Sequence, residues 1–202
     1  MGSGNALQYA LQYKGNLVDI AVGIKNGEIH QFDLINCDDK KLAFMASIGI
    51  EGAITKLRDR YLVQGETGLK TYLKAAFRAS FSEYRRFKAT ITVDGKTSDV
   101  NNLLSLMVVK QPYYGYAMKV VPKARFNDRQ LHLLYISSGL FMSLVGIGTA
   151  FTIGNRAGQY RKGRQVSVQL DHPVLLQIDG NPAWENDAFI FTVMARGLKL
   201  KF

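Results

Sequence analysis

Apolar residues along the chain gather in short runs that are separated by polar turn residues. Val, Ile, Leu and Phe dominate the runs, and several runs alternate apolar with polar positions, as half-buried strands do. The runs that predict strands are residues 17–22, 28–35, 41–50, 87–93, 103–109, 131–136, 165–170, 174–178 and 188–194. This pattern indicates a mainly β protein.

Turn residues connect many of these runs at hairpin spacing. Asn-Gly and Asp-Gly pairs accept the positive φ angles that two-residue hairpin turns need. The predicted turns are Lys25-Asn26-Gly27, Cys37-Asp38-Asp39, Asp94-Gly95 and Asp179-Gly180-Asn181. Strands that are joined by such short turns run antiparallel.

Helical periodicity is weaker than the strand pattern. In the second candidate helix, a spacing of three to four residues puts Leu69, Leu73, Ala76, Phe77 and Phe81 on one face. The candidate helices are residues 54–61, 68–81 and 140–151. Since hairpins outnumber helical crossovers, we expect a mainly β fold with a few helices (α+β), an antiparallel β-sandwich or flattened barrel.

Composition narrows the class of protein. The chain has 202 residues, 47% of them hydrophobic, which suits one large domain with a sizeable core. A net charge of +10 favours phosphates, anionic head groups or nucleic acid as partners. Cys37 is the single cysteine, so no internal disulfide can form, and the scattered histidines give no zinc spacing.

One uncharged stretch, residues 130–155, is long enough to cross a bilayer. Its Ser, Gly and Thr residues dilute the hydrophobicity, and basic residues flank both ends. We therefore expect a buried strand followed by a buried or interfacial helix, with a transmembrane helix as the minor alternative.

The chain begins with a glycine-rich loop, Gly2, Ser3, Gly4 and Asn5, followed by the helix-forming run that starts at Ala6. Such a loop lets backbone N–H groups approach a phosphate at the positive end of a helix. The alternative is a flexible or artificial start of the chain.

The loop resembles the GSGNA or GTGND loop of the sphingosine kinase and diacylglycerol kinase family, lipid kinases with a GGDGT-type catalytic domain. In that family the loop follows a complete nucleotide-binding domain. The resemblance thus implies that residues 1–202 are a single C-terminal domain, with residues 1–14 as the nucleotide loop and helix start. It also implies ATP and Mg²⁺ as cofactors and a lipid hydroxyl as the phosphoryl acceptor.

Further motifs extend the resemblance to substrate and nucleotide contacts. Asp33, in Gln31-Phe32-Asp33-Leu34, stands where sphingosine-kinase-like members hold the lipid head group. The segment 46–52 resembles a strand-to-loop step that precedes a basic helix in the family. There a basic residue approaches the ATP phosphates, and the spacing leaves Arg58 and Arg60 as alternatives.

Two motifs match with departures. The segment 121–128 resembles a family loop that binds a structural magnesium, and Asp128 survives as a candidate ligand, but Lys123 and Arg129 replace a common acid and a glycine. Near the C-terminus, Asp179 and Gly180 resemble the family's DGE turn beside the nucleotide. Asn181 replaces the glutamate, and an amide cannot act as a general base. The catalytic residue is therefore unassigned, with Asp179 as a candidate.

These features favour the substrate-binding part of an ATP-dependent kinase that phosphorylates diacylglycerol or a sphingoid base, inactive without a nucleotide-binding domain. We expect a cytoplasmic protein at the membrane periphery, with residues 140–151 lining the acyl-chain pocket and a homodimer as one form of self-association. The alternative is a non-catalytic lipid-binding or regulatory protein on the same fold. A nucleic-acid binder is disfavoured because the basic residues are spread along the chain and form no RNA- or DNA-binding motif.

Overall fold

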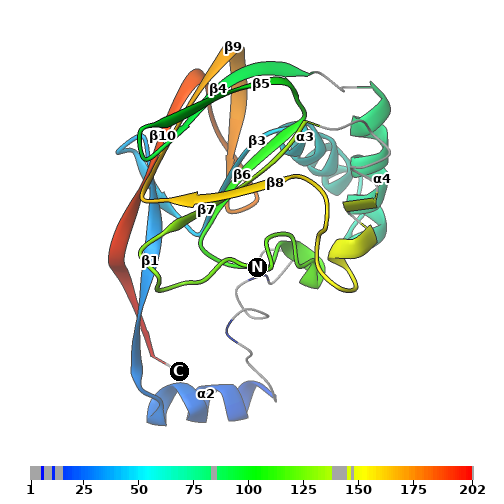
Figure 1. Ribbon diagram of the computed structural model, residues 1–202. Helices are drawn as coiled ribbons and strands as arrows, with labels where there is room; N and C mark the ends of the chain where they lie inside the picture. Colours follow the sequence, from blue (N-terminus) through cyan, green and yellow to red (C-terminus); the bar gives the residue numbers. More distant parts are fainter. Residues whose placement is uncertain are drawn as a thin grey trace.

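The computed structural model describes Ala6, Leu11 and residues 16–82, 86–137, 145–146 and 148–201 (Figure 1). Within them, ten strands form a sandwich-like sheet in the order β2-β1-β10-β9-β3-β6-β7-β8, and β4 and β5 branch from β9. All strand pairs are antiparallel. The strands are β1 (Ile29–Cys37), β2 (Lys41–Ala43), β3 (Met45–Gly49), β4 (Phe87–Val93), β5 (Lys96–Leu103), β6 (Ser105–Val109), β7 (Leu131–Ile136), β8 (Gln159–Gly163), β9 (Gln165–Ile178) and β10 (Asn181–Lys201). The predicted fold class is confirmed.

Strand β9 makes the sheet double back on itself. Its first half, from Val166 to Leu170, pairs with β4, whereas its end, from Leu176 to Ile178, pairs with β3. The other edge of β9 follows β10, whose register shifts twice along the pair. The inward-facing residues of both halves and of β4, β6 and β7 form the main hydrophobic core. The sequence predicted two strands here, and the structure joins them into one.

The segment predicted as the first strand is a helix. Helix α2 (Leu17–Asn26) begins at Asn16, whose side chain accepts hydrogen bonds from the N–H groups of Val18 and Asp19. The Asp19 carboxylate accepts the Asn16 N–H at 3.2 Å and completes a capping box. The alternating apolar pattern is therefore misleading, because this cap fixes a helical start. The hairpin predicted at Asn26-Gly27 is also wrong, since β1 pairs with β10 instead.

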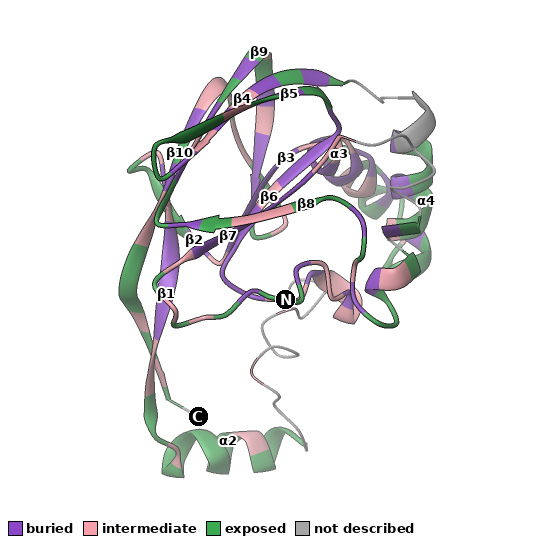
Figure 2. Cartoon of the chain, viewed as in Figure 1, coloured by how far each residue is buried: buried purple, intermediate pink, exposed green. Residues whose placement is uncertain are grey.

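Helix α2 buries none of its residues. Figure 2 shows it exposed along nearly its whole length, at the end of the molecule where β1 begins. Leu17 and Val18 are 84% and 70% exposed, although both are apolar. Exposed apolar residues that lie together in this way are typical of an interaction surface.

Two longer helices of the described chain, α3 (Ile50–Val63) and α4 (Gly68–Ser82), lie side by side and contain the predicted segments 54–61 and 68–81 (Figure 1). Their shared core takes small residues from α4, namely Ala75, Ala76 and Ala79. Small side chains let the two helix backbones approach closely, so α4 turns its larger apolar residues outward. Leu69, Leu73 and Phe77 are accordingly exposed, whereas Ala76, which was predicted on the same face, is buried.

Gly49 positions the start of α3. Its φ is +105°, and a Cβ atom there would collide with the carbonyl oxygen of Leu104. The N–H of Ile50 donates to that same oxygen at 3.1 Å. Only glycine suits this junction, which carries the chain from the buried strand β3 directly into α3.

Of the third predicted helix, residues 140–151, residues 140–144 and 147 lie outside the described residues, whereas residues 145–146 and 148–150 are helical. Of the helices in the described part of the chain, none is both long and apolar enough to cross a membrane. Cys37 is fully buried in β1, and burial together with the nearby carboxylates of Asp179 and Asp38 raises its pKa to about 12.

Candidate functional site

The structure brings together two of the residues predicted to contact a nucleotide. Arg58, on α3, donates through Nη2 to the carbonyl oxygen of Gly180 at 3.2 Å, and the same atom pairs with Asp59 Oδ1 at 2.8 Å. Gly180 lies in the turn between β9 and β10, far from α3 in sequence. The Arg58 side chain retains 19% of its exposure. It is thus held in place at the surface beside the turn, where part of its guanidinium fork still faces solvent.

Arg60 lies elsewhere on α3. Two residues along a helix correspond to a rotation of about 200°, so Arg58 and Arg60 point to different sides. Arg60 is exposed, and within the described part of the chain its side chain has no hydrogen bond or ion pair. Of the two alternatives that the sequence leaves open, only Arg58 adjoins the Asp179-Gly180 turn.

Asp179 uses its carboxylate to tie this turn to β3. Oδ1 accepts the N–H of Met45 at 2.9 Å and that of Phe44 at 3.2 Å. Burial raises its pKa to about 6, against the opposing effect of these two hydrogen bonds. Asn181 donates only to the Asp179 carbonyl oxygen, at 3.4 Å. The turn is therefore anchored to the sheet, and the Asp179 carboxylate is used to accept backbone N–H groups.

Asp33 lies in a second place, in an irregular stretch of β1. Between Phe32 and Leu34 the pairing with β10 shifts, so that Asp33 lies opposite residues 195–197. Its own N–H then donates to the Phe126 carbonyl oxygen at 3.0 Å rather than to β10. The residue is 1% exposed. A bulge of this kind re-aims a side chain.

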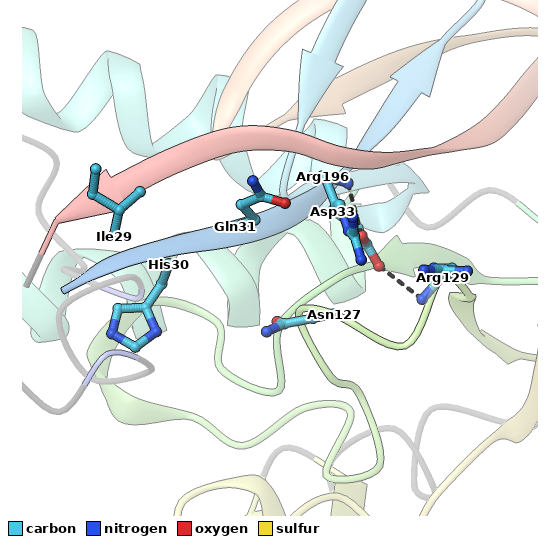
Figure 3. A pocket seen from close by; sticks show the side chains of 7 residues that line it. All are labelled: Ile29, His30, Gln31, Asp33, Asn127, Arg129 and Arg196. Carbon is cyan, nitrogen blue, oxygen red and sulfur yellow. Dashed lines mark hydrogen bonds between the residues drawn. The ribbon is translucent and has the colours of Figure 1, made fainter.

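Three donors from distant segments converge on the Asp33 carboxylate, as Figure 3 shows for the first two. Oδ2 accepts the backbone N–H of Arg129 at 2.7 Å, and Oδ1 accepts that of Arg196 at 3.0 Å. Lys110 Nζ, on a fully buried side chain, lies 3.2 Å from Oδ2. The predicted head-group residue therefore has its oxygens engaged by the chain itself.

Lys110 connects Asp33 to Asp128. Its ammonium donates to Asp128 Oδ1 at 2.8 Å and to the Gln130 carbonyl oxygen at 2.6 Å. Burial alone would raise the Asp128 pKa, but the hydrogen bond and the charge of Lys110 outweigh it and lower that pKa. Lys110 was not predicted as a site residue, although a lysine directly after the buried strand β6 is a signal that could have identified it.

The Asp128 carboxylate does not suit Mg²⁺. Its second oxygen, Oδ2, lies 2.9 Å from His132 Nε2, and His132 Nδ1 lies 2.8 Å from the Tyr160 hydroxyl. Burial lowers the His132 pKa, against the opposing charge of Asp128. Mg²⁺ needs several oxygen ligands, and the described residues contain no group of three His, Cys, Asp or Glu side chains that could hold a metal. Lys110 takes the place that a cation would need.

A pocket of about 420 Å³ opens beside Asp33 (Figure 3). Three segments line it: the first half of β1, the connection between β6 and β7, and β10. The lining residues are Ile29, His30, Gln31, Asp33, Asn127, Arg129 and Arg196. The pocket is polar and has two arginines at its edge.

A buried polar cluster between α3 and the sheet was also missed by the sequence analysis. Ser105 Oγ donates to Glu51 Oε1, while Glu51 Oε2 is buried without a partner. Nearby, Gln177 Nε2 donates to Thr55 Oγ1 at 2.7 Å and to the Tyr114 hydroxyl at 3.1 Å. Burial raises the Glu51 pKa to about 7. The signal was faint, because Glu51 resembles any acid in the first turn of a helix.

Glu51→Gln tests this buried acid through the pH dependence of stability. The folded protein binds the Glu51 proton up to about pH 7, whereas an unfolded chain releases it near 4.5. Stability therefore falls as pH rises through this window, by about 3 kcal/mol at most. The variant should match the parent at pH 4 and exceed it at pH 8 in urea unfolding. Glu185→Gln, at an exposed ion pair, is the control, and equal pH profiles of parent and Glu51→Gln would contradict the prediction.

The fold is shared with solved kinase structures from Bacillus anthracis str. Sterne. One is described as "a putative diacylglycerol kinase" (TM-score 0.80, 17% identity) and another as a diacylglycerol kinase (TM-score 0.68, 15% identity). Each match covers 100% of this chain but 66% and 64% of the longer one. The chain thus spans slightly less than two thirds of these proteins. No curated protein sequence matches it.

The family follows from the sequence model that matches residues 45–188, described as the YegS C-terminal NAD kinase beta sandwich-like domain. The matched range takes in β3 to β9 and most of the residues discussed above. The chain belongs to this family, and its fold is that of the corresponding part of these solved structures. The glycine-rich loop at residues 2–5 lies outside the described residues and stays a prediction.

Proposed function

We propose that the chain is the C-terminal, substrate-binding part of an ATP-dependent kinase that phosphorylates the hydroxyl of diacylglycerol or a sphingoid base. The observation that carries the proposal is the family match over residues 45–188, together with the fold shared with proteins described as diacylglycerol kinases. Phosphoryl transfer depends mostly on positioning and on neutralising charge. A domain that supplies only part of the site is consistent with that requirement.

Arg58 supports the nucleotide side of this proposal. Its guanidinium, which also pairs with Asp59, lies beside the Gly180 carbonyl oxygen, at a surface turn that joins the two longest strands. A guanidinium in this position can hold two phosphate oxygens of a nucleotide bound across from it. Since neither Asp128 nor Asp179 offers a free oxygen pair, we assign the metal no step among the described residues.

The outer face of α4 supports the lipid side. Leu73 and Phe77 are 41% and 63% exposed. The basic residues Lys70, Lys74 and Arg78 follow the apolar stripe at neighbouring positions, and α4 contains no acidic residue. An apolar stripe next to positive charge is typical of a helix that rests on an anionic lipid surface. We therefore place peripheral membrane contact at α4.

The test is a lipid-kinase assay with ATP, magnesium and mixed micelles that contain diacylglycerol or sphingosine. The chain is assayed alone and with a separately expressed GGDGT-bearing N-terminal domain. We expect phosphate transfer to lipid only in the reconstituted mixture, because this chain spans 66% and 64% of the solved chains described as diacylglycerol kinases.

The outcomes separate the two candidate functions. Lipid binding without phosphate transfer in either sample would favour the non-catalytic lipid-binding protein. Absence of both binding and transfer would reject both candidates. An α4 variant, Leu73→Ser with Phe77→Ser, should lose vesicle binding while keeping micelle activity, which tests the membrane contact separately.

A further inference from the structure

The pocket beside Asp33 has two arginines whose charge is not used within the protein. In the described part of the chain, neither the Arg129 nor the Arg196 guanidinium makes an ion pair or hydrogen bond; both residues use only their backbone N–H groups, toward Asp33. Both are exposed and line the same pocket from different segments (Figure 3). Two cationic side chains therefore border one open space.

Both arginines also have unfavourable backbone conformations. Their φ angles are +55° for Arg129 and +53° for Arg196, in the left-handed region that glycine occupies most easily. Strained backbone of this kind occurs frequently at binding sites. Glycine would serve the backbone better at both positions, so the arginine side chains are the feature that needs an explanation.

The negative charge in the pocket is already balanced. Asp33 lies on the pocket wall, but its carboxylate accepts two N–H groups and lies 3.2 Å from the ammonium of Lys110. Lys110 is fully buried and remains fixed there. The two arginine charges are thus left uncompensated, and Asn127 and Gln31 add amide donors at the wall.

We propose that this pocket binds a phosphate group, with Arg129 and Arg196 as its two cationic contacts. Guanidinium forks match phosphate oxygens in pairs, and two of them can grip one phosphate from two sides. The phosphate can belong to a phosphorylated glycerol head group or to a polyphosphate chain. The identity of the molecule that carries the phosphate rests on the proposed function. The binding of phosphate does not, because it requires no kinase activity.

The experiment measures binding to the purified full chain by calorimetry at constant ionic strength. Inorganic phosphate is the basic probe, glycerol 3-phosphate stands for a lipid head group, and tripolyphosphate stands for a nucleotide. Arg129→Gly and Arg196→Gly remove the charges while relieving the strained backbone, so the fold should persist. Arg164→Ala removes a positive charge from the β8–β9 connection, outside the pocket, and so controls for the change in net charge. Asn102→Gly puts glycine at another position with a positive φ (+60°) and so controls for the change in backbone strain.

We expect saturable binding of phosphate that each Arg→Gly change weakens about tenfold and neither control alters. Tighter binding of glycerol 3-phosphate supports a head-group site, and tighter binding of tripolyphosphate supports a nucleotide site. No saturable binding of any probe, or equal binding by the Arg→Gly variants and the parent, overturns the inference. Phosphate binding that depends on both arginines upholds it even if the reconstituted kinase assay is silent.

Discussion

Replacing Lys110 with methionine is expected to lower the free energy of unfolding by about 3–5 kcal/mol. The ammonium lies 3.2 Å from Asp33 Oδ2 and 2.8 Å from Asp128 Oδ1, on a side chain with no exposure. Methionine fills a similar volume but leaves the buried Asp33 carboxylate without its cation. A loss of this size is a large share of the 5–15 kcal/mol that stabilises a typical domain. Urea unfolding measures it directly.

The charge explanation has its own control. The double variant Lys110→Met with Asp33→Asn has no uncompensated charge at Asp33 and should regain part of the lost stability. Lys88→Met, on the exposed side of β4, controls for loss of a surface lysine. A loss at Lys110 of about 1 kcal/mol or less, as for an exposed ion pair, would contradict the role assigned to this network.

Strands that are marked by an alternating pattern or a turn motif could be predicted from the sequence. Strand pairings that depend on contacts between distant segments could not. The alternation in β4 and the Asp94-Gly95 turn predicted the start of a hairpin, and the structure has that hairpin, although β5 itself was not among the predicted strands. By contrast, β9 changes partner along its length, from β4 to β3, which no local pattern encodes. The helix α2 was missed because alternating apolar residues were weighted above the Asn16 capping box.

The candidate sites show the same limit. The resemblance put Gly180 and either Arg58 or Arg60 at the nucleotide, and the structure brings Arg58 within hydrogen-bond distance of Gly180. Lys110 had no motif, because its importance comes from two carboxylates that reach it from β1 and from the β6–β7 connection. Residues that act through tertiary contacts alone, such as Lys110 and Glu51, leave little trace in a single sequence.

In the reconstituted kinase, Arg58→Ala is expected to lower kcat/KM for ATP about 100-fold. Removing one preorganised group that stabilises developing charge costs activity of this order. The stability of the chain should hardly change, since the Arg58–Asp59 pair is partly exposed and such pairs contribute little. Steady-state kinetics and thermal unfolding of the same preparations separate the two effects.

Arg60→Ala is the matched control, because it removes the same charge from the same helix on a side that does not face Gly180. Arg58→Lys should give an intermediate rate, since an ammonium keeps the charge but loses the planar fork that pairs with two phosphate oxygens. If Arg58→Ala and Arg60→Ala reduce kcat/KM equally, net positive charge on α3 is what matters. If only Arg58 variants lose activity while their unfolding temperature is unchanged, the contact with Gly180 places Arg58 at the nucleotide.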